Sequence, residues 1–370
     1  MNKFKLKNLS LMLLGLTLSA PSLAVDISGS IRANYSIKDF SDASKATGGD
    51  FDFNTLGIKL SQDFENYGFV AEYRFADGYD YLKNGYVYWN AYEDLTLQLG
   101  VVSKAFGNKN FASHNWWYSL NYYLGFEDDY GVGFNINHKF NNFETDFSFI
   151  QSSLYKGSDY RNFAGTISSG TIDGTTYNNK EYNTVSLRES YRWENDNWQV
   201  LLGASVEYGQ LYNPVADESG DNLNYAVHLD AKYRGWGVQL QYLKYDFDQY
   251  DDGQIDTSKI GVGAVNGFYE VAAKGDIMTF NLSKVVDTQW GGQFTFYNDF
   301  SILTPDESNF DDSVLNSTGV SLSYKQFFVY VDYYHAKNVV WLGDNSLGLR
   351  DPHIFSPELC RTYRFEASYG

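Results

Sequence analysis

Cysteine, proline and long apolar runs are almost absent from this sequence. Cys360 is the only cysteine, so no intrachain disulfide can form. No segment after residue 24 has the 18 consecutive apolar residues that identify a membrane-spanning helix. If the chain resides in a membrane, it must therefore form a closed barrel of strands, because every backbone polar group needs a partner there.

Basic residues and histidines are also scarce. The chain has 28 Lys and Arg against 46 Asp and Glu, and its net charge is −18. Nucleic acid is excluded as a natural partner, because phosphate binding needs a basic surface. Of five histidines, only His228 shares a predicted strand face with a nearby carboxylate, Asp230, and no nucleophile lies beside them. The sequence predicts no catalytic residue, no cofactor and no metal site, and we expect no enzyme activity.

The first 24 residues have the features of a cleaved secretory signal. Lys3, Lys5 and Lys7 precede the apolar run 9–18, and Ser22 to Ala24 place small residues at the two positions that a signal peptidase reads. A run of about ten residues is too short to span a bilayer as a helix. We expect export, cleavage after Ala24, and a single domain over residues 25–370.

The remaining sequence is rich in aromatic residues and alternates strictly between apolar and polar positions. It contributes most of the 32 Tyr, 27 Phe and 8 Trp, a composition that suits aromatic girdles at two membrane interfaces. Along residues 25–38, Ile27 and Ile31 fall on one face of a strand, and Ser30 and Arg32 fall on the other. Successive strand side chains point to opposite sides, so one face meets an apolar phase and the other meets water.

The same alternation recurs along the chain and predicts sixteen strands. They are 25–38, 51–62, 67–76, 84–91, 95–102, 130–140, 143–152, 182–193, 198–208, 223–233, 236–245, 275–286, 289–300, 314–324, 327–337 and 360–369. Two-residue connections such as 141–142 alternate with long ones such as 153–181, which predicts short turns at one end and long loops at the other. Residues 268–273 could lengthen the twelfth strand or form a strand of their own.

The four prolines after residue 24 agree with these boundaries, because each falls in a predicted long loop. They are Pro214, Pro305, Pro352 and Pro357. A proline inside a closed ladder would remove an inter-strand hydrogen bond. The sequence therefore predicts an all-β fold, a 16-stranded antiparallel transmembrane β-barrel with short periplasmic turns and long external loops.

In this architecture the chain resembles the sixteen-stranded porins of Gram-negative outer membranes. The resemblance covers residues 25–370, and Phe365 and Tyr369 in the last strand are similar to the C-terminal assembly signal of outer-membrane proteins, although Gly370 follows. It implies an outer-membrane location, contact with lipid and lipopolysaccharide, a homotrimer, and passive diffusion of ions and small hydrophilic solutes.

The long third loop, 103–129, is the candidate constriction of such a barrel. Wall side chains cannot fill a sixteen-stranded lumen, so its properties depend on what narrows it. Because a large exposed apolar segment would be sticky, we expect this loop to fold inward; packing on neighbouring loops or at a trimer interface is the alternative. The relevant side chains are the aromatic Trp116, Trp117, Tyr118, Tyr122 and Tyr123 and the acidic Glu127, Asp128 and Asp129.

Basic residues on the polar strand faces are predicted to line the lumen. Four of them come from strands that are neighbours in a closed barrel: Arg32, Lys59, Arg74 and Arg364. Three more come from other strands on the same face: Arg188, Arg192 and Lys139. A cation that faced lipid at mid-depth would cost roughly 2–4 kcal/mol, which favours the lumen. Opposite the loop acids, this wall would create a transverse field; alternatively, the cations only neutralise lumenal acids such as Glu72 and Asp146.

Three functions are compatible with these patterns. The first is a general diffusion porin. The second is a selective channel for phosphate or for oligosaccharides, acidic ones included, in which the loop aromatics stack on sugar faces. The third is a non-conducting structural or adhesive barrel whose loops plug it. Acidic residues in the external loops are expected to be solvated, or to bind lipid phosphates through divalent cations.

Overall fold

The computed structural model describes residues 25–109, 111–115, 117–155, 160–250, 253, 255–343 and 346–349. The chain is all-β over these residues, and fifteen strands form one antiparallel sheet. In sheet order they are β1 (Asp26–Ser36), β2 (Asp50–Phe64), β3 (Tyr67–Ala76), β4 (Tyr79–Tyr92), β5 (Leu95–Ser103), β6 (Tyr130–Phe140), β7 (Phe143–Ser152), β11 (Lys180–Glu194), β12 (Trp198–Asn213), β13 (Glu218–Tyr233), β14 (Trp236–Asp248), β17 (Lys274–Asp287), β18 (Gln293–Pro305), β19 (Ser313–Tyr324) and β20 (Phe327–Lys337). The predicted sixteenth strand, the signal segment and Cys360 lie outside the described residues.

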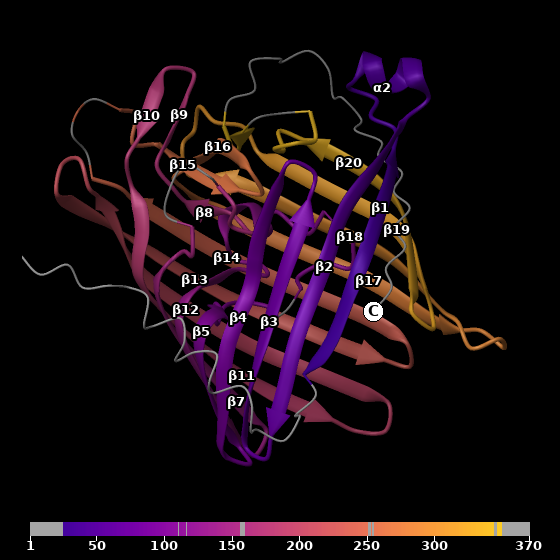
Figure 1. Cartoon of the computed structure of the whole chain (residues 1–370). Coiled ribbons are helices and arrows are strands. Elements are labelled where there is room, and N and C mark those ends of the chain that lie inside the picture. Colours follow the sequence, from indigo (N-terminus) through magenta and orange to yellow (C-terminus); the bar gives the residue numbers. More distant parts are fainter. Residues whose placement is uncertain are drawn as a thin grey trace, which may run out of the picture.

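The sheet curves strongly. Figure 1 shows β1 to β4 in front of β17 to β19, and β1 and β20 are the edges of the sheet within the described part of the chain. The short helix α2 (Asp42–Thr47) stands at the upper end, where most of the long connections also lie. Several upper connections are shorter than predicted: residues 77–78 join β3 and β4, residues 214–217 join β12 and β13, and residues 306–312 join β18 and β19.

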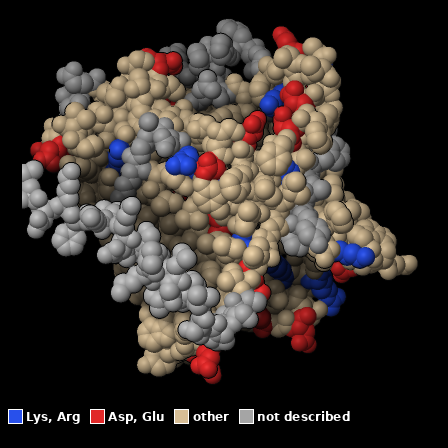
Figure 2. Space-filling model, in the orientation of Figure 1, with Lys and Arg blue, Asp and Glu red and all other residues tan. Residues whose placement is uncertain are grey.

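One face of the sheet carries exposed apolar side chains. Ile27 is 75% exposed, Leu99 62% and Leu202 56%, although all three belong to regular strands. Figure 2 shows that most of the surface on this side is uncharged, with charged atoms in small scattered groups. Large exposed aromatic residues lie next to the short turns, and they include Trp89, Tyr92, Phe140, Trp193, Trp198, Trp236 and Trp290. An apolar band bordered by aromatic residues is the surface that lipid requires.

The strands extend further than predicted at several ends, and one proline prediction was wrong. Pro305 is the last residue of β18, where it pairs with Gly275 of β17. At the end of a strand the missing N–H costs the ladder little, because few pairs follow. Pro214 lies in a turn as predicted, and Pro352 and Pro357 lie outside the described residues.

The long upper connections contain structure of their own. β8 (Thr166–Ile167), β15 (Lys259–Ala264), β16 (Gly267–Ala272) and β21 (Ser346–Leu347) form a second sheet, and β9 (Gly170–Ile172) pairs with β10 (Thr175–Tyr177). Most of the ambiguous segment 268–273 thus forms its own strand, β16, which does not belong to the main sheet. No helix in the described ranges is long and apolar enough to cross a membrane.

The buried apolar core lies inside the curve of the main sheet. The core is built by the connection 104–129, by the upper loops and by inward-facing apolar residues of β12 to β20. Leu243, Ile277 and Tyr334 are examples of these strand residues. Tyr122, Tyr123 and Phe126 of that connection pack in one cluster with Val262 of β15 and Tyr269 of β16. The Tyr269 hydroxyl donates to the Tyr123 carbonyl at 2.7 Å. The upper loops and the third connection therefore form one packed unit.

Candidate functional site

Residues 104–129, here called the inward loop, lie against the polar face of the main sheet. Their backbone N–H groups donate to inward-facing strand side chains: Gly107 to Ser205 Oγ at 3.0 Å and Asn108 to Gln241 Oε1 at 2.7 Å. The strand residues that accept from loop N–H groups in this way include Ser148 of β7, Ser205 of β12, Gln241 of β14 and Ser301 of β18. The alternation of each strand positions these acceptors, so the period-two pattern builds a polar seat for the loop.

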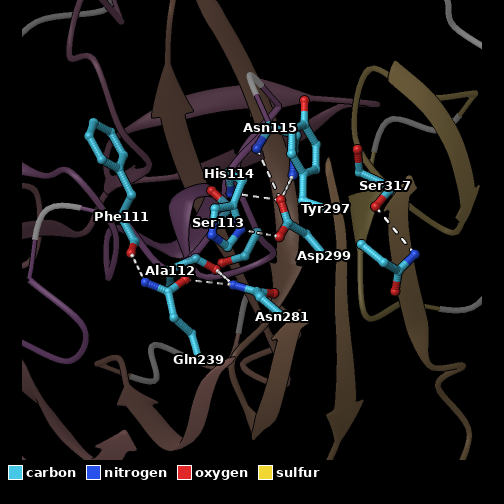
Figure 3. A network of polar contacts seen from close by, with 12 residues as sticks. Phe111, Ala112, Ser113, His114, Asn115, Gln239, Asn281, Tyr297, Asp299 and Ser317 are labelled. Atoms are coloured by element: carbon cyan, nitrogen blue, oxygen red, sulfur yellow. Dashed lines mark hydrogen bonds and ion pairs between the residues drawn. The ribbon is translucent and has the colours of Figure 1, made fainter. Parts of the chain in front are cut away.

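Asp299 of β18 fixes the middle of the inward loop (Figure 3). Its Oδ2 accepts from the backbone N–H groups of His114 and Asn115 at 2.6 and 3.0 Å and from Asn115 Nδ2 at 2.8 Å. Its Oδ1 lies 2.7 Å from His114 Nδ1. Asn281 lies on the neighbouring strand β17, and its Nδ2 donates to the Ala112 carbonyl at 2.6 Å. Several charge-assisted hydrogen bonds to one carboxylate hold this part of the loop in a defined position.

Glu127 closes the inward loop on itself. Its carboxylate accepts from the Ala112 N–H at 2.9 Å, the Ser113 hydroxyl at 2.7 Å, and the Ser119 N–H and hydroxyl at 3.0 and 2.5 Å. The side chain is buried, and burial raises the pKa of Glu127 to about 7 although these donors favour the charged form. All of these donors belong to the inward loop itself, so Glu127 stabilises the loop from within.

The two ends of the inward loop meet at a buried charge cluster. Lys104 Nζ lies 3.2 Å from Asp129, 3.2 Å from Glu181 of β11 and 3.4 Å from Glu207 of β12. Burial raises the pKa of Asp129 to about 7. Burial disfavours the charged form of Lys104, but the three carboxylates outweigh it and hold its pKa well above the usual range. Like Glu127, Asp129 has a structural partner inside the protein.

Three of the predicted pore cations, Arg188, Arg192 and Lys139, come from strands other than β1 to β3. Arg188 is 1% exposed, donates through Nε to the Gly107 carbonyl at 2.8 Å, and pairs with Asp146 at 2.8 Å, so it anchors the inward loop from below. Arg192 is exposed near a short turn and pairs with Glu194 at 3.1 Å. Lys139 is exposed beside the turn at 141–142. Lys59 is exposed on β2 and pairs in register with Glu72 of β3, two residues from Arg74. Arg364 lies outside the described residues.

A cavity of about 470 Å³ separates the inward loop from β1 to β4. We call it the basic–aromatic cavity. Its sheet side includes Arg32, Asn34 and Ser36 of β1, Asp52, Asn54 and Thr55 of β2, and Arg74 of β3; its other side includes Trp117, Tyr118 and Tyr122 of the inward loop, Phe163 and Trp341. The structure thus brings Arg32 and Arg74 together with three of the predicted loop aromatics. Tyr123 is buried behind them, and Trp116 is not described.

The ring of Phe163, which lines this cavity, contacts two cations. The Arg74 guanidinium is 5.0 Å from the centroid of the Phe163 ring, and Lys83 Nζ is 4.6 Å from it. Glu72 holds Arg74 Nε at 2.6 Å, and Asp128 holds Lys83 at 2.7 Å. The cations are therefore fixed both by carboxylates and by the negative face of an aromatic ring.

Sequence reasoning missed several of these residues. Tyr81 and Lys83 fall in β4, in a stretch that was predicted to be a loop; the alternation of Tyr79 and Tyr81 was the available signal. Phe163 and Trp341 come from two distant upper connections, and no local pattern indicates that they line one cavity with Arg74.

Comparison with known proteins gives a match in structure alone. No family model and no curated protein matches this sequence. The outer membrane channel DcaP of Acinetobacter baumannii aligns with a TM-score of 0.57 and 12% identity over 93% of this chain and 96% of that one. OmpT, an outer membrane protein of Vibrio cholerae, aligns with a TM-score of 0.55 and 10% identity over 95% of this chain and 98% of that one. OmpF of Salmonella typhi, in complex with daunomycin, aligns with a TM-score of 0.55 and 10% identity over 93% of this chain and 97% of that one. This chain therefore shares the fold of these outer-membrane proteins.

Proposed function

We propose that this protein is an outer-membrane porin of a Gram-negative cell, and that ions and small hydrophilic solutes diffuse passively through it. One observation carries the proposal: the curved sheet turns apolar side chains outward and encloses polar strand faces, the inward loop and a polar cavity. Residues 360–369 would supply the sixteenth strand that closes the barrel, since an even count is the rule for such chains.

The geometry of the inward loop supports a narrow path rather than a wide one. The loop covers the polar face of β7 to β18, whereas the basic–aromatic cavity follows β1 to β4. We place the route of solutes along that cavity. A lumen of sixteen strands needs such a filling element, because wall side chains do not reach across it.

Export and assembly follow from the same proposal. Residues 1–24 would be removed as the signal peptide, the exposed apolar band would contact lipid and lipopolysaccharide, and three copies would assemble. The mass of the purified complex in detergent, corrected for bound detergent, tests the trimer. A mass that corresponds to one chain would contradict it.

The proposal assigns no catalytic residue and no cofactor. Among the described residues, no group of three His, Cys, Asp or Glu side chains could hold a metal ion. Of the alternatives, a solute-selective channel is favoured by one observation, the combination of two arginines and several aromatic rings around a single cavity. A non-conducting barrel would have to close that cavity as well.

Conductance across a planar bilayer tests the proposal. The purified full chain should insert in discrete steps of ohmic current that scale with salt concentration. Arg32→Ala with Arg74→Ala should shift the reversal potential in a salt gradient toward cations, because it removes positive charge from the cavity. Arg192→Ala is the matched control, because Arg192 is exposed near a short turn, and its shift should be much smaller. Folded protein that never conducts would contradict the porin function and leave the plugged barrel.

A further inference from the structure

We propose that the basic–aromatic cavity is a binding site for a short acidic saccharide, a pyranose chain that carries carboxylates. This rests on the proposed function, because the solute must enter the barrel to reach the cavity. The inference concerns the chemistry of the solute and goes beyond passive diffusion. Four features of the cavity support it: its two unlike walls, its arginines, its size and its rigidity.

The two walls of the cavity differ in chemistry. The sheet side presents most of the amides, hydroxyls and carboxylates, among them Asn34, Asp52 and Thr55, together with rings of β2 and β4 such as Tyr81. The opposite side presents the rings of Trp117 and Tyr118. A solute that satisfies both walls needs an apolar face and a polar edge. A pyranose ring has both, because its C–H groups form a flat face and its hydroxyls project from the rim.

Other anions match only part of this lining. Inorganic phosphate would suit the arginines but would leave the aromatic wall uncovered. An aromatic carboxylate would stack on Trp117, but it has no hydroxyls for Asn34 and Asp52, and unmatched polar groups are costly in a small-molecule site. A saccharide supplies donors for Asp52 and acceptors for the Asn34 amide.

The charges of the cavity favour an acidic saccharide over a neutral one, because its lining has three cations, Arg32, Lys38 and Arg74, against two carboxylates, Asp52 and Asp77. Arg32 and Arg74 both line the cavity, from the neighbouring strands β1 and β3 on either side of β2. Glu72 and Phe163 hold Arg74, so its planar guanidinium is oriented before any solute arrives. Guanidinium groups bind carboxylates through two parallel hydrogen bonds, a geometry that lysine cannot reproduce.

The cavity is large enough and rigid enough for a short oligosaccharide. Its volume of about 470 Å³ lies within the roughly 300–1,000 Å³ usual for small-molecule sites. Tyr118 and Tyr122 stack with centroids 4.4 Å apart, and the Tyr122 hydroxyl donates to the Phe163 carbonyl. An aromatic wall fixed in this way loses little freedom on binding, which favours affinity.

Block of single-channel current by defined solutes tests the inference on the full chain. The probes are trigalacturonate, maltotriose as its neutral counterpart, benzoate and inorganic phosphate. We expect trigalacturonate to block at millimolar concentration or below, and the other three to require at least tenfold more. Trp117→Ala and Arg32→Gln should each weaken the block by trigalacturonate at least tenfold. Trp290→Ala, at an exposed tryptophan near a short turn, and Arg192→Gln should leave it unchanged.

Each contrary result has a distinct meaning. Equal block by maltotriose would overturn recognition of the carboxylates, and stronger block by benzoate or phosphate would overturn the saccharide. Normal conductance without block by any probe would sink the inference but leave the porin function intact. If no current is seen, the porin function fails, and calorimetric titration of the detergent-folded protein with trigalacturonate still decides the binding site. Heat of binding that Trp117→Ala abolishes supports the site, and no heat overturns it.

Discussion

Two parts of the polar face of the main sheet differ in what covers them. Under the inward loop, Arg188 and Asp299 are almost completely buried, because the loop takes their hydrogen bonds. Along β1 to β3, Asp52 is exposed and Arg32 is half-buried at the edge of a cavity. Both parts follow the same alternation. The difference shows that a polar strand face can be either a seat for a loop or the lining of a passage, depending on what covers it.

The largest effect is expected from removal of the anchor below the loop. Arg188→Ala should lower the free energy of unfolding by about 3–5 kcal/mol, because it breaks a buried ion pair and leaves the Gly107 carbonyl without this donor. Arg192→Ala should change it by about 0–1 kcal/mol, because the side chain is exposed. Urea titration of detergent-folded protein measures both. Equal losses would show that the covered and uncovered cations do not differ as the structure indicates.

The second effect concerns pH. The pKa of Glu127 is raised to about 7 by burial, so between about pH 4.5 and 7 the folded state holds a proton that the unfolded chain has released. Stability should therefore fall as pH rises through this window, by about 3 kcal/mol at most. Glu127→Gln should flatten the dependence, and Glu65→Gln, in an exposed short turn, should not. Asp129 should keep a residual slope, since its pKa is raised in the same direction. Unfolding midpoints at pH 5 and 8 provide the measurement.

A third, smaller effect is expected at the middle of the loop. Asp299→Ala leaves the N–H groups of His114 and Asn115 without their acceptor and should cost about 1–3 kcal/mol. Amide hydrogen exchange should accelerate at residues 112–121 and stay unchanged in the short turns. Asp287→Ala, at an exposed end of the adjacent strand, is the control. Unchanged protection at residues 112–121 would show that this carboxylate does not hold the loop.

The smallest change in stability is expected on the cavity wall. Asp52→Asn should alter the free energy of unfolding by no more than about 0.5 kcal/mol, because the side chain is exposed. The same substitution should shift the reversal potential toward anions, since it removes a negative charge from the cavity lining. A large loss of stability without a shift in the reversal potential would contradict this, because it would show that Asp52 supports the fold and does not line the path of ions.

Much of the fold could be read from local pattern. All fifteen predicted strands that fall in the described part of the chain are present, and alternation assigns Ser205, Gln241 and Asp299 to the polar face before any contact is known. The pattern did not reveal the second sheet, because strands as short as Ser346–Leu347 carry no periodic signal. It also did not separate Arg188 from Arg32, because both lie at polar positions of regular strands.

The sequence by itself determined which side of each strand of the main sheet carries the polar residues and in what order these strands follow one another. The pleat of a strand is a local property, and its period of two is visible in any ten residues. Only the tertiary structure decided which part of the polar face the inward loop would cover, and that Phe163 and Trp341 would meet Arg74 at one cavity. Those contacts join residues far apart in the chain, so they depend on how the curved sheet and the upper loops pack around each other.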